Sequence, residues 1–170
     1  MLTVLILLSA TTAAYFDFRW RRIPNWLVGA TIVLSFVWHG WTAGWNGLLM
    51  SGAGLFVGGA LLLPLYLLKG MGAGDVKFFA AIGAAVSYKH VLTVFVFAAL
   101  IAGGMALFRV LVARALVATL SNIVDILNRF LHGRFGAHPV AGLANENALV
   151  IPFGVSVAAA TWLFVLLGAK

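Results

Sequence analysis

The chain has 170 residues, of which 64% are apolar and 9% charged, with eleven Lys or Arg against four Asp or Glu and a formal net charge of +7. Soluble domains carry about a quarter charged residues, and a fold of this size cannot bury so much apolar surface. The composition therefore excludes a soluble enzyme, a disordered tail and a fibrous protein, and it predicts an all-α, polytopic integral membrane protein formed by a single domain, residues 1–170.

Six apolar runs are predicted to be transmembrane helices, since about 20 residues cross a bilayer core. The first run lacks the basic region that precedes a secretory signal and is interpreted as a retained span. The second and third runs are separated by WHGWTAGWN, whose Trp residues are typical of a membrane interface. The predicted spans are 1–17, 24–42, 47–68, 78–88, 91–111 and 149–167.

The fourth run, 78–88, is short. It forms a short or tilted helix of its own, or it merges with the fifth run into one long span, which would move the C-terminus to the other side. With six spans, nine basic residues lie on one side and two, Lys89 and Lys170, on the other. Because positive residues concentrate in cytoplasmic loops, the nine mark the cytoplasmic face of an inner (cytoplasmic) membrane: Arg19, Arg21, Arg22, Lys69, Lys77, Arg109, Arg114, Arg129 and Arg134.

Residues 112–135 have an amphipathic pattern, with apolar and polar side chains on opposite sides of one helix. We expect this helix to lie on the cytoplasmic membrane surface, either as a simple anchor or as an element that covers the site or docks a substrate. Asp125 then belongs to a solvated face and can pair with Arg129 one turn on. Glu146 is interpreted as a surface acid in the following loop.

The two remaining acids, Asp17 and Asp75, follow the first and third spans and are predicted to meet at the cytoplasmic membrane edge. Carboxylates near lipid are costly and usually functional, and two that converge can share a proton. Such a pair can activate water as aspartyl proteases do, without a metal or cofactor. The alternatives remain open: Asp17 pairs with Arg21, and Asp75 caps the helix that follows it.

Glycines and histidines add little that is specific. Gly70, Gly72 and Gly74 allow a sharp bend before Asp75 and the close approach of a substrate backbone, although a tight turn between helices explains them equally well. Gly54 and Gly58 predict a close helix contact. No metal site or cofactor is expected, because Cys is absent and the histidines are dispersed: His39, His90, His132 and His138.

Three segments resemble motifs of the type IV prepilin peptidases. DFRWRRIPN at 17–25 is similar to their first aspartate motif, GAGDVK at 72–77 to the second, and IPFG at 151–154 to the start of their last helix. The resemblance implies that Asp17 and Asp75 are the catalytic pair and that Gly72 and Gly74 position Asp75. Lys77 is assigned with these glycines to an active-site loop, where it tunes the pair, or it is an interfacial anchor like Lys69.

The resemblance also implies a substrate and a cellular place. Members of the family remove short basic leader peptides from pilin-like precursors at the cytoplasmic membrane face. Larger members carry a cysteine-bearing insertion and also methylate the new N-terminus, whereas this chain contains no Cys and is similar to small, peptidase-only forms of tight-adherence (Flp) pilus systems. An archaeal preflagellin-type peptidase is a related alternative.

The expected partners are a pilin-like precursor and the lipid bilayer. Nucleic acid is not expected, because the basic residues are scattered between apolar runs. The oligomeric state is left open. A non-enzymatic subunit, either a pilus-assembly scaffold or a small ion-coupled transporter, is the rival interpretation.

Overall fold

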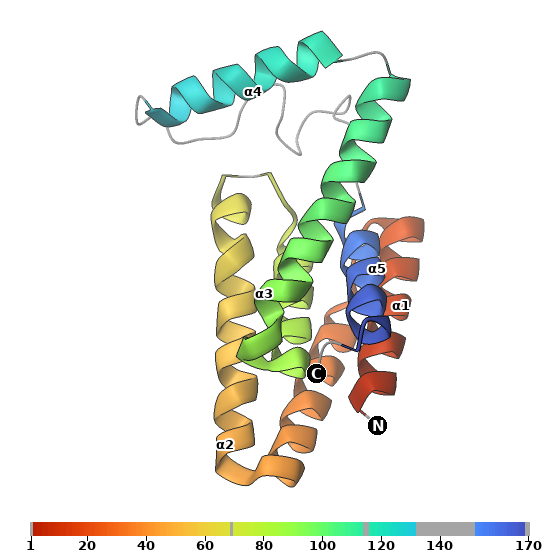
Figure 1. The fold of residues 1–170 in the computed structure, drawn as a ribbon, viewed down its shortest axis with the longest axis vertical. Helices are drawn as coiled ribbons and strands as arrows, with labels where there is room; N and C mark the ends of the chain where they lie inside the picture. The colour runs from red at the N-terminus through yellow and green to blue at the C-terminus, as the bar shows by residue number, and fades with distance from the viewer. Residues whose placement is uncertain (1, 69, 114–115, 132–151, 169–170) are drawn as a thin grey trace.

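The structure is a computed structural model that describes residues 2–68, 70–113, 116–131 and 152–168, and the regular elements of these segments are all helices. They are α1 (Leu2–Trp20), α2 (Asn25–Leu67), α3 (Ala73–Val112), α4 (Leu116–Leu131) and α5 (Phe153–Leu166) (Figure 1). In the described segments, α1, α2 and α3 are long and apolar enough to cross a membrane, and α5 is apolar but shorter. The predicted all-α class is confirmed for this part of the chain.

The long helix α2 folds back on itself at Gly44, whose backbone is not helical (φ 56°, ψ −137°). Three residues after this point, Gly47 lies so close to the carbonyl of His39 that a Cβ atom would overlap it. The halves 25–43 and 45–67 therefore run antiparallel, as Figure 1 shows. The reversal falls within the predicted Trp-rich turn.

The helix α3 reverses in the same way at Ser87 (φ 67°, ψ 165°). Phe79 and Phe95, eight residues before and after it, face each other with ring centroids 6.0 Å apart. The halves 73–86 and 88–112 are thus antiparallel, and the merged straight span considered above is not formed. The predicted start of the fourth run at residue 78 is wrong, because α3 already begins at Ala73.

The second half of α2 packs tightly against the first half of α3. Cβ atoms added to Gly54 or Gly83 would each overlap the carbonyl of the other residue, so the two backbones are in direct contact. The Ser51 hydroxyl donates to the carbonyl oxygen of Ala84 across the same contact, at 2.9 Å. The predicted small-residue contact of this segment is therefore confirmed, and it lies beside the largest fully buried side chains, Phe78, Phe79, Leu62 and Ile82.

The helix α5, which is the last in the chain, packs between the first helix, α1, and the central helix, α3. Along this contact the indole N–H of Trp162 donates to the Thr11 hydroxyl oxygen at 3.0 Å. The beginning of α1 and the end of α5 lie beside both chain reversals, where Leu2, His39, Ser87 and Val165 line a cavity of about 470 Å³. We call the region around Gly44 and Ser87 the reversal end.

At the opposite end of the molecule, α1 ends and α3 and α5 begin, and α4 lies across it (Figure 1). We call the region around Asp17, Asp75 and Gly154 the aspartate end. Helix direction places most of the described basic residues here, namely Arg19, Arg21, Arg22, Lys77 and Arg109, whereas Lys89 follows the reversal at Ser87. The predicted separation of the basic residues thus holds for the part of the chain that is described.

Within the predicted 112–135, the structure describes α4 at Leu116–Leu131, Val112 ends α3, and residues 114–115 and 132–135 lie outside the described residues. Leu120 and Ile123 are exposed on one side of this helix, and Ser121 and Asp125 are exposed on another. The side chain of Arg129, the predicted partner of Asp125, lies outside the described residues, as do Glu146, His132 and His138.

Candidate active site

The candidate site is built where the end of α1 meets the starts of α3 and α5. Asp17 lies in the last turn of α1 and is only 6% exposed. The helix stops shortly after it, because Arg21 takes a left-handed backbone (φ 51°) while its N–H donates to the Asp17 carbonyl oxygen at 2.9 Å. Arg21 thus lies outside α1, and its guanidinium acts on the Asp17 carboxyl electrostatically.

The Asp17 carboxyl is bound by the backbone at the start of α5. The N–H of Gly154 donates to Oδ2 of Asp17 at 2.7 Å, and the N–H of Val155 also hydrogen-bonds this carboxyl. Pro152 precedes the helix with an extended backbone (φ −71°, ψ 95°). Because the first N–H groups of a helix have no partner within it, α5 can offer them to Asp17.

Asp75 lies in the first turn of α3 and is half-buried. The residue that caps this helix is Gly72, and the N–H of Asp75 donates to the Gly72 carbonyl oxygen at 3.2 Å. The prediction of Asp75 as the cap is therefore wrong: it is the third residue inside the helix, and its carboxyl interacts with the backbone N–H of Gly72. A side chain at this position can reach back to the cap.

The fold brings the two acids together from distant parts of the sequence. The Asp17 carboxylate acts electrostatically on the Asp75 carboxyl. The connection between α1 and α2 lies against the start of α3, since a Cβ atom on Gly74 would be 3.8 Å from the backbone nitrogen of Ile23. Asp17 and Asp75 thus lie at neighbouring helix termini, near enough for their charges to interact.

The other predicted site residues differ in their surroundings. A Cβ atom on Gly72 would lie 3.3 Å from Oδ2 of Asp75, whereas one on Gly74 would make only ordinary contacts. The Gly70 N–H donates to the Leu65 carbonyl oxygen at 2.9 Å and closes the turn before α3. Lys77 is exposed, and two residues along a helix differ in direction by about 200°, so it points away from Asp75. Gly74 and Lys77 lie in α3 and not in a loop.

The contact that sequence reasoning missed is the one between Asp17 and α5. IPFG resembles a segment of the family. Nothing in its spacing, however, indicates that the N–H of Gly154 reaches Asp17, 137 residues away in the sequence. The available signal was a Pro followed closely by a Gly at the start of an apolar run, on the same predicted side as Asp17.

No group of three or more potential metal-ligating side chains occurs among the described residues. His39 and His90 lie at the reversal end and hydrogen-bond backbone carbonyls of Ser35 and Val86 through Nδ1, at 2.9 Å and 3.2 Å. The described groups that meet at the candidate site are two carboxyls and backbone N–H groups.

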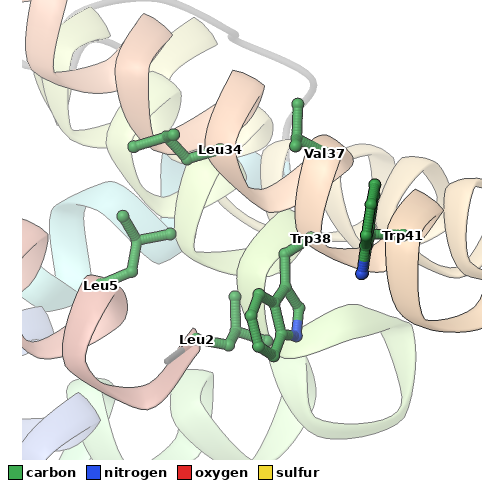
Figure 2. Close-up of a pocket in the computed structure, with 6 residues that line it drawn as sticks. All are labelled: Leu2, Leu5, Leu34, Val37, Trp38 and Trp41. Atoms are coloured by element: carbon green, nitrogen blue, oxygen red, sulfur yellow. The ribbon is translucent and has the colours of Figure 1, made fainter.

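A second cavity, of about 350 Å³, lies between the beginning of α1 and the first half of α2 (Figure 2). Its lining is apolar and consists of Leu2, Leu5, Leu34, Val37, Trp38 and Trp41. None of these side chains can donate or accept a proton in catalysis, so this apolar cavity is not a candidate for the catalytic site.

Fold and site together define an all-helical protein with long apolar helices and two interacting acids at helix ends. The model of the type IV leader peptidase family matches residues 4–107, more than half of the chain, and the chain belongs to this family. The match contains both Asp17 and Asp75 and ends within α3, so that α4 and α5 lie outside it. No curated protein and no solved structure matches the chain significantly.

Proposed function

We propose that this protein is an aspartic endopeptidase that removes short basic leader peptides from pilin-like precursors. The observation that carries the proposal is that Asp17 and Asp75 lie at the junction of α1, α3 and α5 and interact electrostatically there. Membership of the leader peptidase family supports a peptidase, and the paired carboxyls supply the chemistry.

The two acids act as a unit that shares one proton, because two like charges in contact do not both ionise readily. The ionised carboxylate takes a proton from a water molecule while the water oxygen attacks the scissile carbonyl carbon. The protonated carboxyl donates its proton to the carbonyl oxygen. Collapse of the tetrahedral intermediate breaks the C–N bond, and the nitrogen of the leaving amine receives a proton from the pair. Gly72, whose added Cβ would lie 3.3 Å from Oδ2 of Asp75, positions Asp75 for these steps.

We further propose six spans: α1, the two halves of α2, the two halves of α3, and α5. The reversals at Gly44 and Ser87 support this count, because each turns the chain back through the bundle. The separation of basic residues supports a cytoplasmic aspartate end, in the inner membrane, with α4 on the membrane surface. The apolar helix of a precursor can then pack laterally against lipid-facing side chains while its basic leader stays in the cytosol.

The absence of Cys supports a peptidase without the methylating insertion of the larger members, similar to the forms found in Flp pilus systems. The substrate class is therefore a short-leader pilin precursor of such a system.

The test is cleavage of a pilin-like precursor by the purified protein in lipid vesicles, with Asp17→Asn and Asp75→Asn as separate variants. Each should lower the rate by about 10²-fold or more, because a group that transfers a proton in the transition state contributes 10²- to 10⁴-fold. Asp125→Asn is the matched control, since Asp125 is an exposed acid on α4. A normal rate in either dyad variant contradicts the proposal.

The same variants distinguish the rival functions. An ion-coupled transporter with intramembrane acids would lose proton or ion flux in the Asn variants and cleave no precursor. A scaffold would support pilus assembly with both Asn substitutions in place. Either result would replace the peptidase proposal.

A further inference from the structure

The two acids of the candidate site have unequal surroundings. Asp17 is almost fully buried and accepts two hydrogen bonds from backbone N–H groups of α5, one of them at 2.7 Å from Gly154. Asp75 is half-buried and interacts with one backbone N–H, that of Gly72. Burial disfavours the charged form of both carboxyls. Hydrogen bonds from N–H donors favour the charged form, and the short bond from Gly154 supplies this compensation at Asp17.

The neighbouring charges differ in the same direction. Arg21 is the cation that acts on Asp17, and the two acids act on each other. Among the described residues, α2 and α5 contain no Asp, Glu, Lys or Arg, and the other cations at this end are exposed, namely Arg19, Arg22, Lys77 and Arg109. A positive charge beside Asp17 favours its ionised form, and mutual repulsion then disfavours a second charge on Asp75.

The start of α5 is shaped to fit the Asp17 carboxyl. A Cβ atom added to Gly154 would lie 2.8 Å from Oδ2 and 3.0 Å from Cβ of Asp17. Any side chain here would displace either the carboxyl or the start of the helix, and the N–H bond would lengthen. The partial positive charge of a helix N-terminus adds to the effect of the direct hydrogen bonds.

We propose that the start of α5 holds Asp17 as the ionised member of the pair, that Asp75 carries the shared proton, and that Gly154 is a positioning residue for this arrangement. The catalytic roles that follow rest on the proposed function: Asp17 takes the proton from water, and Asp75 gives its proton to the scissile carbonyl oxygen. The protonation states themselves do not depend on that function.

The order of protonation can be read directly, because the chain contains only three aspartates, Asp17, Asp75 and Asp125. Full-length protein labelled with ¹³C at the Asp carboxyls gives three signals, which the Asn variants assign. On titration, the Asp17 signal should make its larger change at the lower-pH step of the pair and the Asp75 signal at the higher-pH step. The reverse order overturns the proposal.

The positioning role is tested with Gly154→Ala against Gly103→Ala, whose added methyl meets nothing within 4 Å. Loss of one hydrogen bond to a charged acceptor should move the lower step to higher pH by about 1 unit, while the Asp125 signal stays in place. The acid limb of kcat should move equally, with KM unchanged. Gly103→Ala should change none of these, and an unshifted step in folded Gly154→Ala contradicts the positioning role.

The outcomes separate this inference from the proposed function. If Asp17→Asn and Asp75→Asn abolish cleavage but the signals titrate in the reverse order, the peptidase stands and the assignment of the proton fails. If no precursor is cleaved, the order of the signals still decides the assignment. If Gly154→Ala does not fold, as the circular dichroism of the helices would show, the titration of the wild-type chain still decides it.

Discussion

The aspartate end and the reversal end of this protein are built on different physical principles. At the aspartate end, helices stop and start, and their free N–H groups bind the carboxyls of Asp17 and Asp75. At the reversal end, the chain turns sharply at Gly44 and Ser87, between the antiparallel halves of α2 and of α3. Under the proposed function, one end serves the chemistry and the other stabilises the fold, so substitutions at the two ends should have separable effects.

The largest expected effect is at the close contact between the second half of α2 and the first half of α3, which run between the two ends. Gly54→Ala adds a methyl that would overlap the Gly83 carbonyl and the backbone of Ser87, so the second half of α2 must move away from α3. We expect a loss of about 3 kcal/mol in the free energy of unfolding, at the upper end of the range for overpacking. Unfolding in detergent measures it. Gly59→Ala on the same helix, whose methyl makes an ordinary 3.6 Å contact, should change stability little, and equal losses would contradict the packing.

The next effect concerns the reversal end alone. Gly44→Ala meets no steric obstacle, but its φ of 56° and ψ of −137° are strained for any residue with a Cβ. The free energy of unfolding should fall by about 2 kcal/mol, with the cleavage rate of the folded fraction unchanged. Gly29→Ala, in open space within the same helix, should be neutral or slightly stabilising. A loss of cleavage in folded Gly44→Ala would couple the two ends and break the comparison.

A pair of glycine variants tests the aspartate end. The methyl of Gly72→Ala would lie 3.3 Å from Oδ2 of Asp75 and should displace the carboxyl, whereas that of Gly74→Ala has room. We expect kcat to fall about tenfold for Gly72→Ala, because a small misplacement of a reacting group is costly, and less than twofold for Gly74→Ala. Steady-state cleavage of the precursor measures both. Equal losses of kcat would show that Gly72 does not act through Asp75.

The smallest effect has the opposite sign. Ser87 holds a backbone region that is essentially restricted to glycine (φ 67°, ψ 165°). Ser87→Gly should therefore raise the free energy of unfolding by about 1 kcal/mol and leave cleavage unchanged. Ser87→Ala keeps the strain and removes the hydroxyl, so it should not stabilise the protein. Stabilisation by both variants would assign the effect to the hydroxyl and not to the backbone.

Much of this structure could be predicted from the sequence. The apolar runs indicate helices, the Trp-rich segment indicates the break near Gly44, and the amphipathic pattern indicates α4, because each is encoded in local periodicity and composition. Two details were wrong: α3 begins at Ala73 and not at residue 78, and Asp75 follows the cap instead of forming it. Helix boundaries depend on competing local hydrogen bonds, which composition does not resolve.

By itself, the sequence determined that this is a helical membrane-type chain with few acids, two of them in motifs of the leader peptidase family. Only the tertiary structure decided what surrounds those two acids. The Gly154 N–H that binds Asp17 lies 137 residues along the chain, and such a contact depends on how α5 packs against α1. Local pattern specifies helices, whereas the difference between Asp17 and Asp75 arises from hydrogen bonds and charges that only packing brings together.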